Sequence, residues 1–178
     1  MVASPDTRRP PDCLHTTMAA ITWKDSLSLQ QPRMDQTHRE FIELLAGLQT
    51  VAADAPPAEV LRCYDAFVTH TEQHFAQEER WMAAMGFAAQ NCHSGNHANV
   101  LGVLRAVRQR LVDEADVPTV RLLVPELATW FESHATTMDA ALAMTMAELG
   151  FDPETQQAVR PRAADAAPIT SCGSASCG

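Results

Sequence analysis

The sequence has no excess of basic residues, no long apolar run and no paired CxxC motif. Lys and Arg number 13 against 22 Asp and Glu, which gives a formal net charge of −9. Nucleic acids and anionic membranes are bound by clustered basic residues, so neither is an expected partner. No stretch approaches the roughly 20 apolar residues that cross a bilayer. The beginning, MVASPDTRRPPDCLH, also lacks the apolar run of a secretory signal.

The five cysteines are odd in number and show no spacing typical of a zinc site or a disulfide framework. We therefore expect reduced thiols in a cytoplasmic protein. Cys92 precedes a histidine and is expected to be a buried thiol, not a metal ligand. Cys172 and Cys177 lie in the Gly/Ser-rich ending SCGSASCG, where disorder is expected and their role is left open.

Both ends of the chain have compositions that bury little surface. Residues 1–17, which include His15, are rich in Pro, Thr and Arg and predict a disordered lead. Residues 153–178 are rich in Ala, Pro, Ser and Gly and predict a flexible tail. The domain is expected to span residues 18–152, where apolar residues follow the helical period and not the alternation of strands.

Four helices are expected in this domain. The first starts near Asp35, and the second follows the prolines of DAPPAE and ends at Gly86. The third begins near Asn91, and the fourth follows Pro118, with an early part that Pro125 makes irregular or kinked. Helices of this length with short connections predict an all-α fold, an antiparallel up-down four-helix bundle.

Five of the seven histidines fall on the apolar faces of these helices. They are His38, His74, His93, His97 and His134. A single histidine in such a position is ordinarily a neutral core residue that hydrogen-bonds a carbonyl. Five together are costly to bury, because the interior of a bundle offers few free carbonyls. A metal ion that binds several imidazole nitrogens removes this cost, so we expect a shared metal site.

The spacing of histidines and carboxylates supports such a site. His93 and His97 are one helical turn apart and lie on one face, and the same holds for His74 and Glu78. Together they offer imidazole and carboxylate ligands, which suit iron, zinc or manganese.

The last helix offers His134 and Asp139, whose spacing differs. They are five residues apart, an angular offset of about 140° on an ideal α-helix. Taken alone, Asp139 would be interpreted as a solvated helix charge. If it belongs to the site, either the helix is locally widened or Asp139 reaches the site from the flank.

The segment HTEQHFAQEER contains two further candidate residues. At 100° per residue, His74 and Glu78 lie about 20° either side of the centre of the apolar face. His70 lies about 60° from that centre and Glu79 about 120° from it. We therefore expect His70 to flank the site, with its role left open, and Glu79 to face solvent.

Four segments resemble the four helices of the hemerythrin family, in particular its single-domain bacterial members. They are MDQTHREF, HFAQEERWM, NCHSGNH and WFESHATTMD, and they carry the family pattern H, HxxxE, HxxxH and HxxxxD in order over about residues 20–150. The resemblance implies two non-haem irons per chain with a bridging oxo or hydroxo group. It implies that His93, His97 and His134 bind one iron, that His38 and His74 bind the other, and that Glu78 and Asp139 bridge them.

This ligand set predicts a site that binds a small molecule. Five imidazoles, two bridging carboxylates and the oxygen bridge fill eleven of the twelve positions around two six-coordinate irons. The vacant position lies on the iron bound by His38 and His74, and an open position is typical of a site that binds or transforms a ligand. The resemblance implies that the ligand is dioxygen, bound reversibly for delivery, storage or sensing, without enzymatic turnover.

Two alternatives are left open. One is a di-iron enzyme that reduces peroxide or nitric oxide at the same position, and the other is a reservoir for iron or another metal such as zinc. Di-iron oxidases in four-helix bundles are carboxylate-rich and carry ExxH motifs, and no such motif here supplies a histidine on an apolar helix face. A site with five histidines and two carboxylates carries less negative charge, which favours the ferrous state and reversible binding. The resemblance also implies a monomer, and it identifies no signalling partner.

Overall fold

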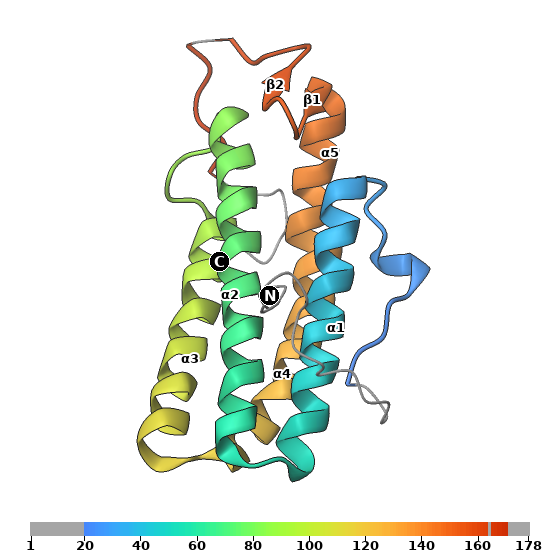
Figure 1. Cartoon of the computed structure of the whole chain (residues 1–178). Helices are drawn as coiled ribbons and strands as arrows, with labels where there is room; N and C mark the ends of the chain where they lie inside the picture. The colour runs from blue at the N-terminus through green and yellow to red at the C-terminus, as the bar shows by residue number, and fades with distance from the viewer. Residues whose placement is uncertain (1–19, 164, 171–178) are drawn as a thin grey trace, which may run out of the picture.

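The computed structural model describes residues 20–163 and 165–170, and its helices form four antiparallel rods (Figure 1). The helices are α1 (Pro32–Asp54), α2 (Pro57–Ala84), α3 (Cys92–Glu114), α4 (Val117–His134) and α5 (Ala140–Leu149). Three rods are single helices, and the fourth is α4 joined to α5 by a π-helical turn (Ala135–Asp139). A 3₁₀ turn (Asp25–Leu27) precedes α1. α1 packs against α2 and α4, and α3 packs against the same two helices, so the rods surround one interior. The expected all-α, up-down four-helix bundle is confirmed.

Side chains and glycines near the helix ends explain where the helices start and stop. The Gln31 side chain accepts hydrogen bonds from two backbone N–H groups of the first turn, so α1 begins at Pro32, earlier than the expected Asp35. Asn91 is the N-cap of α3 in a reciprocal capping box, at the position expected from the sequence. Gly86 follows α2 with a φ of 86°, a left-handed conformation that glycine adopts without strain.

The fourth rod differs from expectation at Pro125. We expected this proline to make the early part of the last helix irregular or kinked. α4 is a continuous α-helix from Val117 to His134, so the irregular form is wrong, and a kink at Pro125 stays a prediction. Proline removes one backbone hydrogen bond, and burial of the adjacent Val124 and nearby Leu127 against the core favours the helix in spite of that loss.

The apolar interior is divided into two clusters along the axis of the bundle. The larger cluster contains Phe41 and Phe131, and the smaller one contains Met34 and Trp81. Along α1, the buried His38 lies between Met34 and Phe41 in sequence, and thus between the two clusters. A layer of buried polar side chains therefore separates the clusters.

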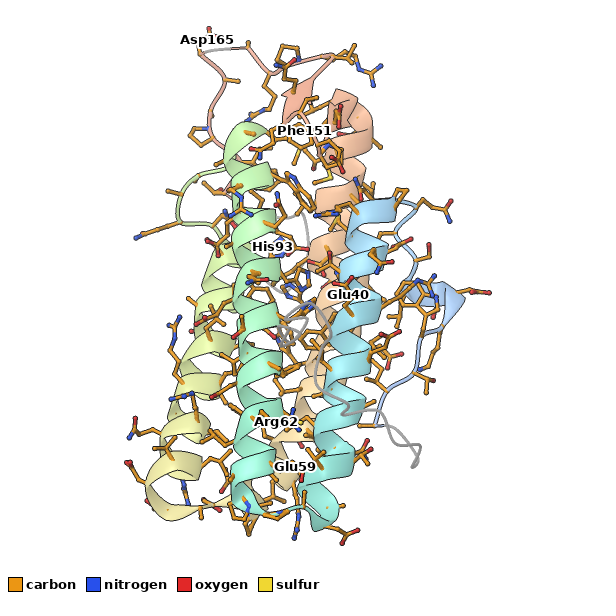
Figure 2. All side chains as sticks on the ribbon, in the orientation of Figure 1. Glu40, Glu59, Arg62, His93, Phe151 and Asp165 are labelled. Atoms are coloured by element: carbon orange, nitrogen blue, oxygen red, sulfur yellow. The ribbon has the colours of Figure 1, made fainter. Side chains whose placement is uncertain are left out.

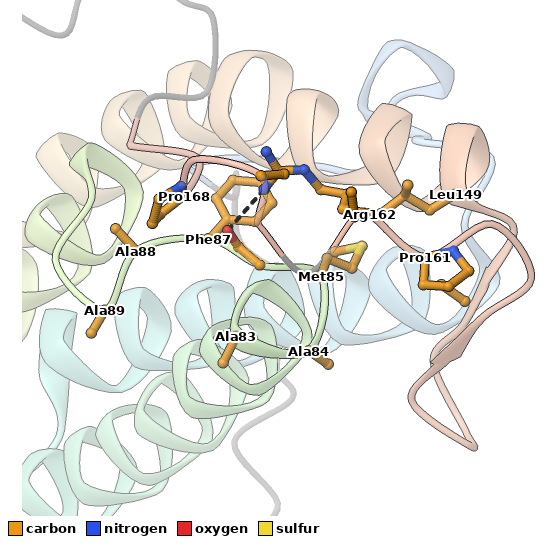
Figure 3. A pocket seen from close by; sticks show the side chains of 14 residues that line it. Ala83, Ala84, Met85, Phe87, Ala88, Ala89, Leu149, Pro161, Arg162 and Pro168 are labelled. Carbon is orange, nitrogen blue, oxygen red and sulfur yellow. Dashed lines mark hydrogen bonds between the residues drawn. The ribbon is translucent and has the colours of Figure 1, made fainter.

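The chain beyond α5 packs back over one end of the bundle (Figures 1 and 3). β1 (Phe151–Asp152) pairs antiparallel with β2 (Gln157–Ala158). Further along, the backbone N–H of Ile169 donates to the carbonyl of Gly86, and Arg162 donates to the same carbonyl at 3.1 Å beside a pocket of about 500 Å³. The described part of the segment expected to be a flexible tail thus makes specific hydrogen bonds, and the division at residues 18–152 stays a prediction.

Several sequence expectations concern cysteines, chain ends and membranes. Cys63 and Cys92 are each disulfide-bonded, so the expectation of reduced thiols is wrong for these two residues. Disulfide pairing depends on the distance between cysteines in the fold and not on their spacing along the chain.

Among the described residues, no helix is both long and apolar enough to cross a membrane. The predictions for the lead 1–17, His15, Cys13, Cys172 and Cys177 lie outside the described residues.

The aromatic core next to the polar layer gives a stability prediction. Phe41 is fully buried, and its ring centroid lies 4.4 Å from that of Phe131 and 4.9 Å from that of Phe67. Phe41→Ala should lower the free energy of unfolding by about 3–5 kcal/mol, because it removes these contacts and leaves a cavity. Leu122→Ala, at a side chain 73% exposed, should change it by less than about 0.5 kcal/mol. Urea denaturation measures both, and equal effects would contradict the packing described here.

Candidate metal centre

The seven predicted site residues meet in the polar layer between the two apolar clusters. α1 and the end of α4 each provide one of them, α2 and α3 each provide two, and the π-helical turn provides the last. None exposes more than 4% of its surface, and the labelled His93 lies among the side chains between the helices in Figure 2. The seven are His38, His74, Glu78, His93, His97, His134 and Asp139.

Three imidazoles converge on one side of this layer. Nε2 of His134 lies 3.1 Å from Nε2 of His93 and 3.1 Å from Nε2 of His97. Two adjacent ligands at about 2.1 Å from an ion of octahedral geometry are about 3 Å apart. Both separations from Nε2 of His134 therefore match those between ligands of one ion. The three histidines are called the histidine trio below.

Two imidazoles occupy the other side and are called the histidine pair. The rings of His38 and His74 have centroids 5.1 Å apart. Nε2 of His38 lies 3.2 Å from Oδ2 of Asp139. The pair and Glu78 form one group of neighbouring potential ligand atoms, and the trio forms a second group with Glu78 and Asp139.

Each of the two carboxylates has one oxygen on each side of the layer. Oε1 of Glu78 lies 3.0 Å from Nε2 of His74, whereas Oε2 lies 3.3 Å from Nε2 of His97. Oδ1 of Asp139 lies 3.0 Å from Nε2 of His93, while Oδ2 faces the histidine pair. Glu78 and Asp139 therefore span the two groups of imidazoles.

The π-helical turn places Asp139 beside His134. The backbone N–H of Ala140 donates to the carbonyl of Ala135, five residues earlier, where an α-helix would use the residue four earlier. A turn widened in this way brings residues five apart onto one face, and Oδ1 of Asp139 lies 3.2 Å from Nε2 of His134. Of the two arrangements left open by the sequence, the local widening is the one observed.

The sequence ATTMD supports this wide turn through its threonines. Widening a turn weakens the hydrogen bonds of the carbonyls that precede it. The hydroxyls of Thr136 and Thr137 donate to the carbonyls of Glu132 and Ser133, each at 2.7 Å. Two side chains therefore satisfy backbone acceptors at the point where the helix changes pitch.

The buried polar atoms of the layer have too few hydrogen-bond partners within the described residues. Both ring nitrogens of His38, both carboxylate oxygens of Asp139 and Oε2 of Glu78 are buried without a hydrogen bond. Burial of such atoms lowers the stability of the fold, because they lose their hydrogen bonds to water and form no hydrogen bond within the protein. A cation among them would bind the lone pairs of imidazoles and carboxylates alike. The donor set therefore fits a metal centre, and its chemistry suits non-haem iron.

The charges of the layer stabilise one another in the metal-free protein. Burial alone would raise the pKa of Glu78, but the neighbouring His74 and His38 hold it well below its usual range. Burial and Glu78 would likewise raise the pKa of Asp139, whereas His134 and His38 hold it well below its usual range. Burial opposes protonation of His38 and His93, yet the two carboxylates raise their pKa values to about 9 and about 10.

Aromatic side chains and one acidic side chain support the trio. Phe75 stacks on His97 with ring centroids 3.9 Å apart, and Trp130 stacks on His134 with centroids 4.6 Å apart. Oε1 of the half-exposed Glu79 lies 3.4 Å from Nδ1 of His97. Glu79 is exposed, as expected from its helical phase, and the contact with His97 accompanies that exposure. The contact of Trp130 with His134 could have been expected, since Trp130 lies one turn before that histidine. The other contacts cross between helices, which the spacing within one helix does not report.

His70 lies beside the centre and outside both groups of potential ligand atoms. Its Nε2 is 3.2 Å from the carbonyl of Thr37, and its ring centroid is 6.2 Å from that of His74. This position agrees with the expectation of a flanking residue.

Comparison with known proteins agrees with this geometry. A family model described as the hemerythrin HHE cation binding domain matches residues 31–145, a span that covers more than half of the chain and includes all seven clustered residues. The chain belongs to the hemerythrin family.

Within this family the chain is similar to proteins named bacteriohemerythrin. It is 39% identical to the bacteriohemerythrin of Ralstonia nicotianae over 135 residues, which are 76% of this chain and 95% of the relative. It is 30% identical to that of Stenotrophomonas maltophilia over 126 residues, which are 71% of this chain and 81% of the relative. No solved structure matched the chain. This hemerythrin is thus bacteriohemerythrin-like, with a buried histidine and carboxylate layer suited to non-haem iron.

The raised pKa values of His38 and His93 give a pH prediction for the metal-free protein. Folding raises both pKa values from 6.5 to about 9 and about 10, so the folded state binds protons that the unfolded state has lost. This stabilisation is complete below pH 6.5 and declines as pH rises towards 9–10, at up to about 1.4 kcal/mol per pH unit for each imidazole.

Urea denaturation with a chelator at pH 7 and pH 9 measures this decline. The iron-loaded protein is the control, because a metal binds neutral imidazoles and its affinity rises as protons leave. A metal-free protein that is equally stable at both pH values would contradict the assigned pKa shifts.

Proposed function

We propose that this hemerythrin holds two non-haem irons per chain and binds dioxygen reversibly at one of them. The observation that carries the proposal is the division of the carboxylate oxygens, one towards the histidine trio and one towards the histidine pair. This division supports a centre in which two ions share two bridging carboxylates. The ligands would be His93, His97 and His134 on one iron and His38 and His74 on the other, with Glu78, Asp139 and an oxo or hydroxo group between them.

The unequal number of imidazoles supports a ligand-binding role. An iron with three imidazoles and three bridging oxygens is fully coordinated, whereas an iron with two imidazoles and the same bridges has one position to spare. The two ferrous ions would supply the electrons that dioxygen takes up on binding and returns on release. Binding at the histidine pair is therefore proposed, with the trio side closed to ligands.

The side chains around the histidine pair suit reversible binding. The ring of Phe131 meets the ring of His38 edge-on with centroids 5.1 Å apart, and Phe41 lies with its centroid 6.5 Å from that of His74. Both phenylalanines are fully buried or nearly so. Apolar walls exclude water and disfavour the escape of charged, reduced forms of oxygen, so the ligand would leave as neutral dioxygen.

Oxygen binding is tested on one purified, iron-loaded sample. We expect two irons per chain by elemental analysis and visible absorption bands that appear on oxygenation and vanish on deoxygenation over repeated cycles. Rapid irreversible oxidation, or turnover of added peroxide or nitric oxide, would instead favour the alternative of a di-iron enzyme. Zinc, or one metal ion per chain, would favour a metal reservoir and contradict the di-iron proposal.

The two histidines of one α2 segment provide a matched pair of variants. His74→Ala should lower the iron content from two to at most about one per chain, because the proposed open iron loses one of its two imidazoles. His70→Ala should keep both irons, since His70 lies outside both groups of potential ligand atoms. Iron analysis of the two purified variants, with circular dichroism to confirm folding, checks the assignment. Equal loss of iron in both would show that His70 is a ligand.

Two expectations accompany this proposal. A monomer and a cytoplasmic location stay predictions, and sedimentation analysis and cell fractionation would check them.

A further inference from the structure

A polar groove lies between α1 and α2, next to the histidine pair. It has a volume of about 330 Å³, and its lining comes from both helices. Glu40, on the α1 side, is labelled in Figure 2. The lining residues that matter here are Arg33, Glu40, His70, His74, Gln77 and Arg80.

Two arginines that form no ion pair with a described residue give one part of this groove a positive charge. Among the described residues, neither Arg33 nor Arg80 forms an ion pair. Arg80 donates a hydrogen bond to Oε1 of Gln77 at 2.8 Å, which leaves the amide N–H groups of Gln77 as further donors. In a chain with a net charge of −9, two guanidinium groups without a carboxylate partner in one groove suit an anionic ligand.

The groove also reaches a buried donor of the metal centre. His74 lines the groove and exposes only 4% of its surface, and its Nδ1 has no hydrogen-bond partner within the described residues. A histidine that binds a metal through Nε2 carries a proton on Nδ1, and that N–H group ordinarily donates to a carboxylate, a carbonyl or water. His97 has such a partner in Glu79, whereas His74, like His38, His93 and His134, has none among the described residues, and of these four only His74 lines the groove. An acceptor in the groove would complete its hydrogen bonding.

We propose that this groove binds one small oxyanion, held by Arg33 and Arg80 and accepting a hydrogen bond from Nδ1–H of His74. The arginine contacts depend only on the lining of the groove. The His74 contact rests on the proposed di-iron function, because it requires His74 to bind iron through Nε2. Glu40, whose carboxylate lies 3.8 Å from Nδ1 of His70, adds negative charge to the same groove. The site therefore suits a small anion beside the arginines and disfavours an extended polyanion.

Sulfate titration by calorimetry, at constant ionic strength on the purified full-length protein, tests the site. We expect one sulfate per chain, bound about tenfold more weakly after Arg33→Gln or Arg80→Gln, since each removes a charge-assisted hydrogen bond. Glu40→Gln should strengthen binding, because it removes a like charge. This opposite sign distinguishes the groove from a general effect of protein charge.

Two control variants change the same charges at the other end of α2. Arg62 and Glu59 pair with each other at 3.8 Å near the lower end of the helix in Figure 2, and neither lines the groove. Arg62→Gln and Glu59→Gln should leave sulfate affinity unchanged. The proposal is overturned if the unmodified protein binds no sulfate, or if these controls shift the affinity as much as the groove variants.

The contact with His74 is tested separately on the ferric, iron-loaded protein. Sulfate should shift the visible absorption of the unmodified protein and of Arg62→Gln, and it should leave the spectrum of the Arg33→Gln/Arg80→Gln double variant unchanged. Sulfate binding by calorimetry with no spectral shift would overturn the His74 contact. Because iron content is measured beforehand, a failure of the di-iron proposal is recognised by the metal analysis and not confused with an absent anion site.

Discussion

Burial of seven ionisable side chains in one layer is the constraint on which the rest of this structure depends. Isolated imidazoles and carboxylates are expensive to remove from water, and here they lie between two apolar clusters with at most 4% of their surface exposed. Even without a metal, they lower this cost only by facing one another, which is why the carboxylates stay ionised while His38 and His93 hold raised pKa values. The helices must therefore keep a fixed register, because a slip of one residue would place a charge against an apolar wall.

The π-helical turn is the backbone's adjustment to this constraint. A continuous α-helix would turn Asp139 away from His134 by about 140°, and the layer would lose the only carboxylate that reaches both groups of imidazoles from the fourth rod. The wider turn costs regular hydrogen bonds, and the hydroxyls of Thr136 and Thr137 satisfy acceptors in the preceding turn. Irregular helix geometry is thus placed where the metal centre needs it, as is frequent at functional sites.

The sequence predicted what lies within single helices and missed what arises between them. His74 with Glu78 and His93 with His97 could be identified because four-residue spacing fixes a shared face. The motifs indicated seven side chains that lie in two adjoining groups sharing Glu78, and their role as iron ligands stays a prediction. Glu79 is exposed, as its helical phase predicted. Its contact with His97 and the stacking of Phe75 on His97 depend on how α2 and α3 pack, so the phase of one helix could not predict them. The contacts of the chain after α5 could not be predicted from the sequence either, because the backbone hydrogen bonds of Ile169 depend on the shape of the bundle end.

The surroundings of the two histidine groups differ, and this asymmetry bears on chemistry. Two rings of the trio are stacked on aromatic side chains, His97 on Phe75 and His134 on Trp130. Such stacking fixes the orientation of the imidazole rings. The pair combines apolar contacts with the polar groove that His74 borders. In a metal centre built in this way, the rings of the trio are held rigidly. The basicity of His74 in the pair can change with the group that its Nδ1 contacts in the groove. The pair also has one imidazole fewer than the trio, so the groove lies next to the position proposed to bind dioxygen. The polarity outside His74 comes from groove residues of α1 and α2, whereas the apolar contacts of the pair come from Phe41 on α1 and Phe131 on α4. Separate substitutions can therefore change the two features independently.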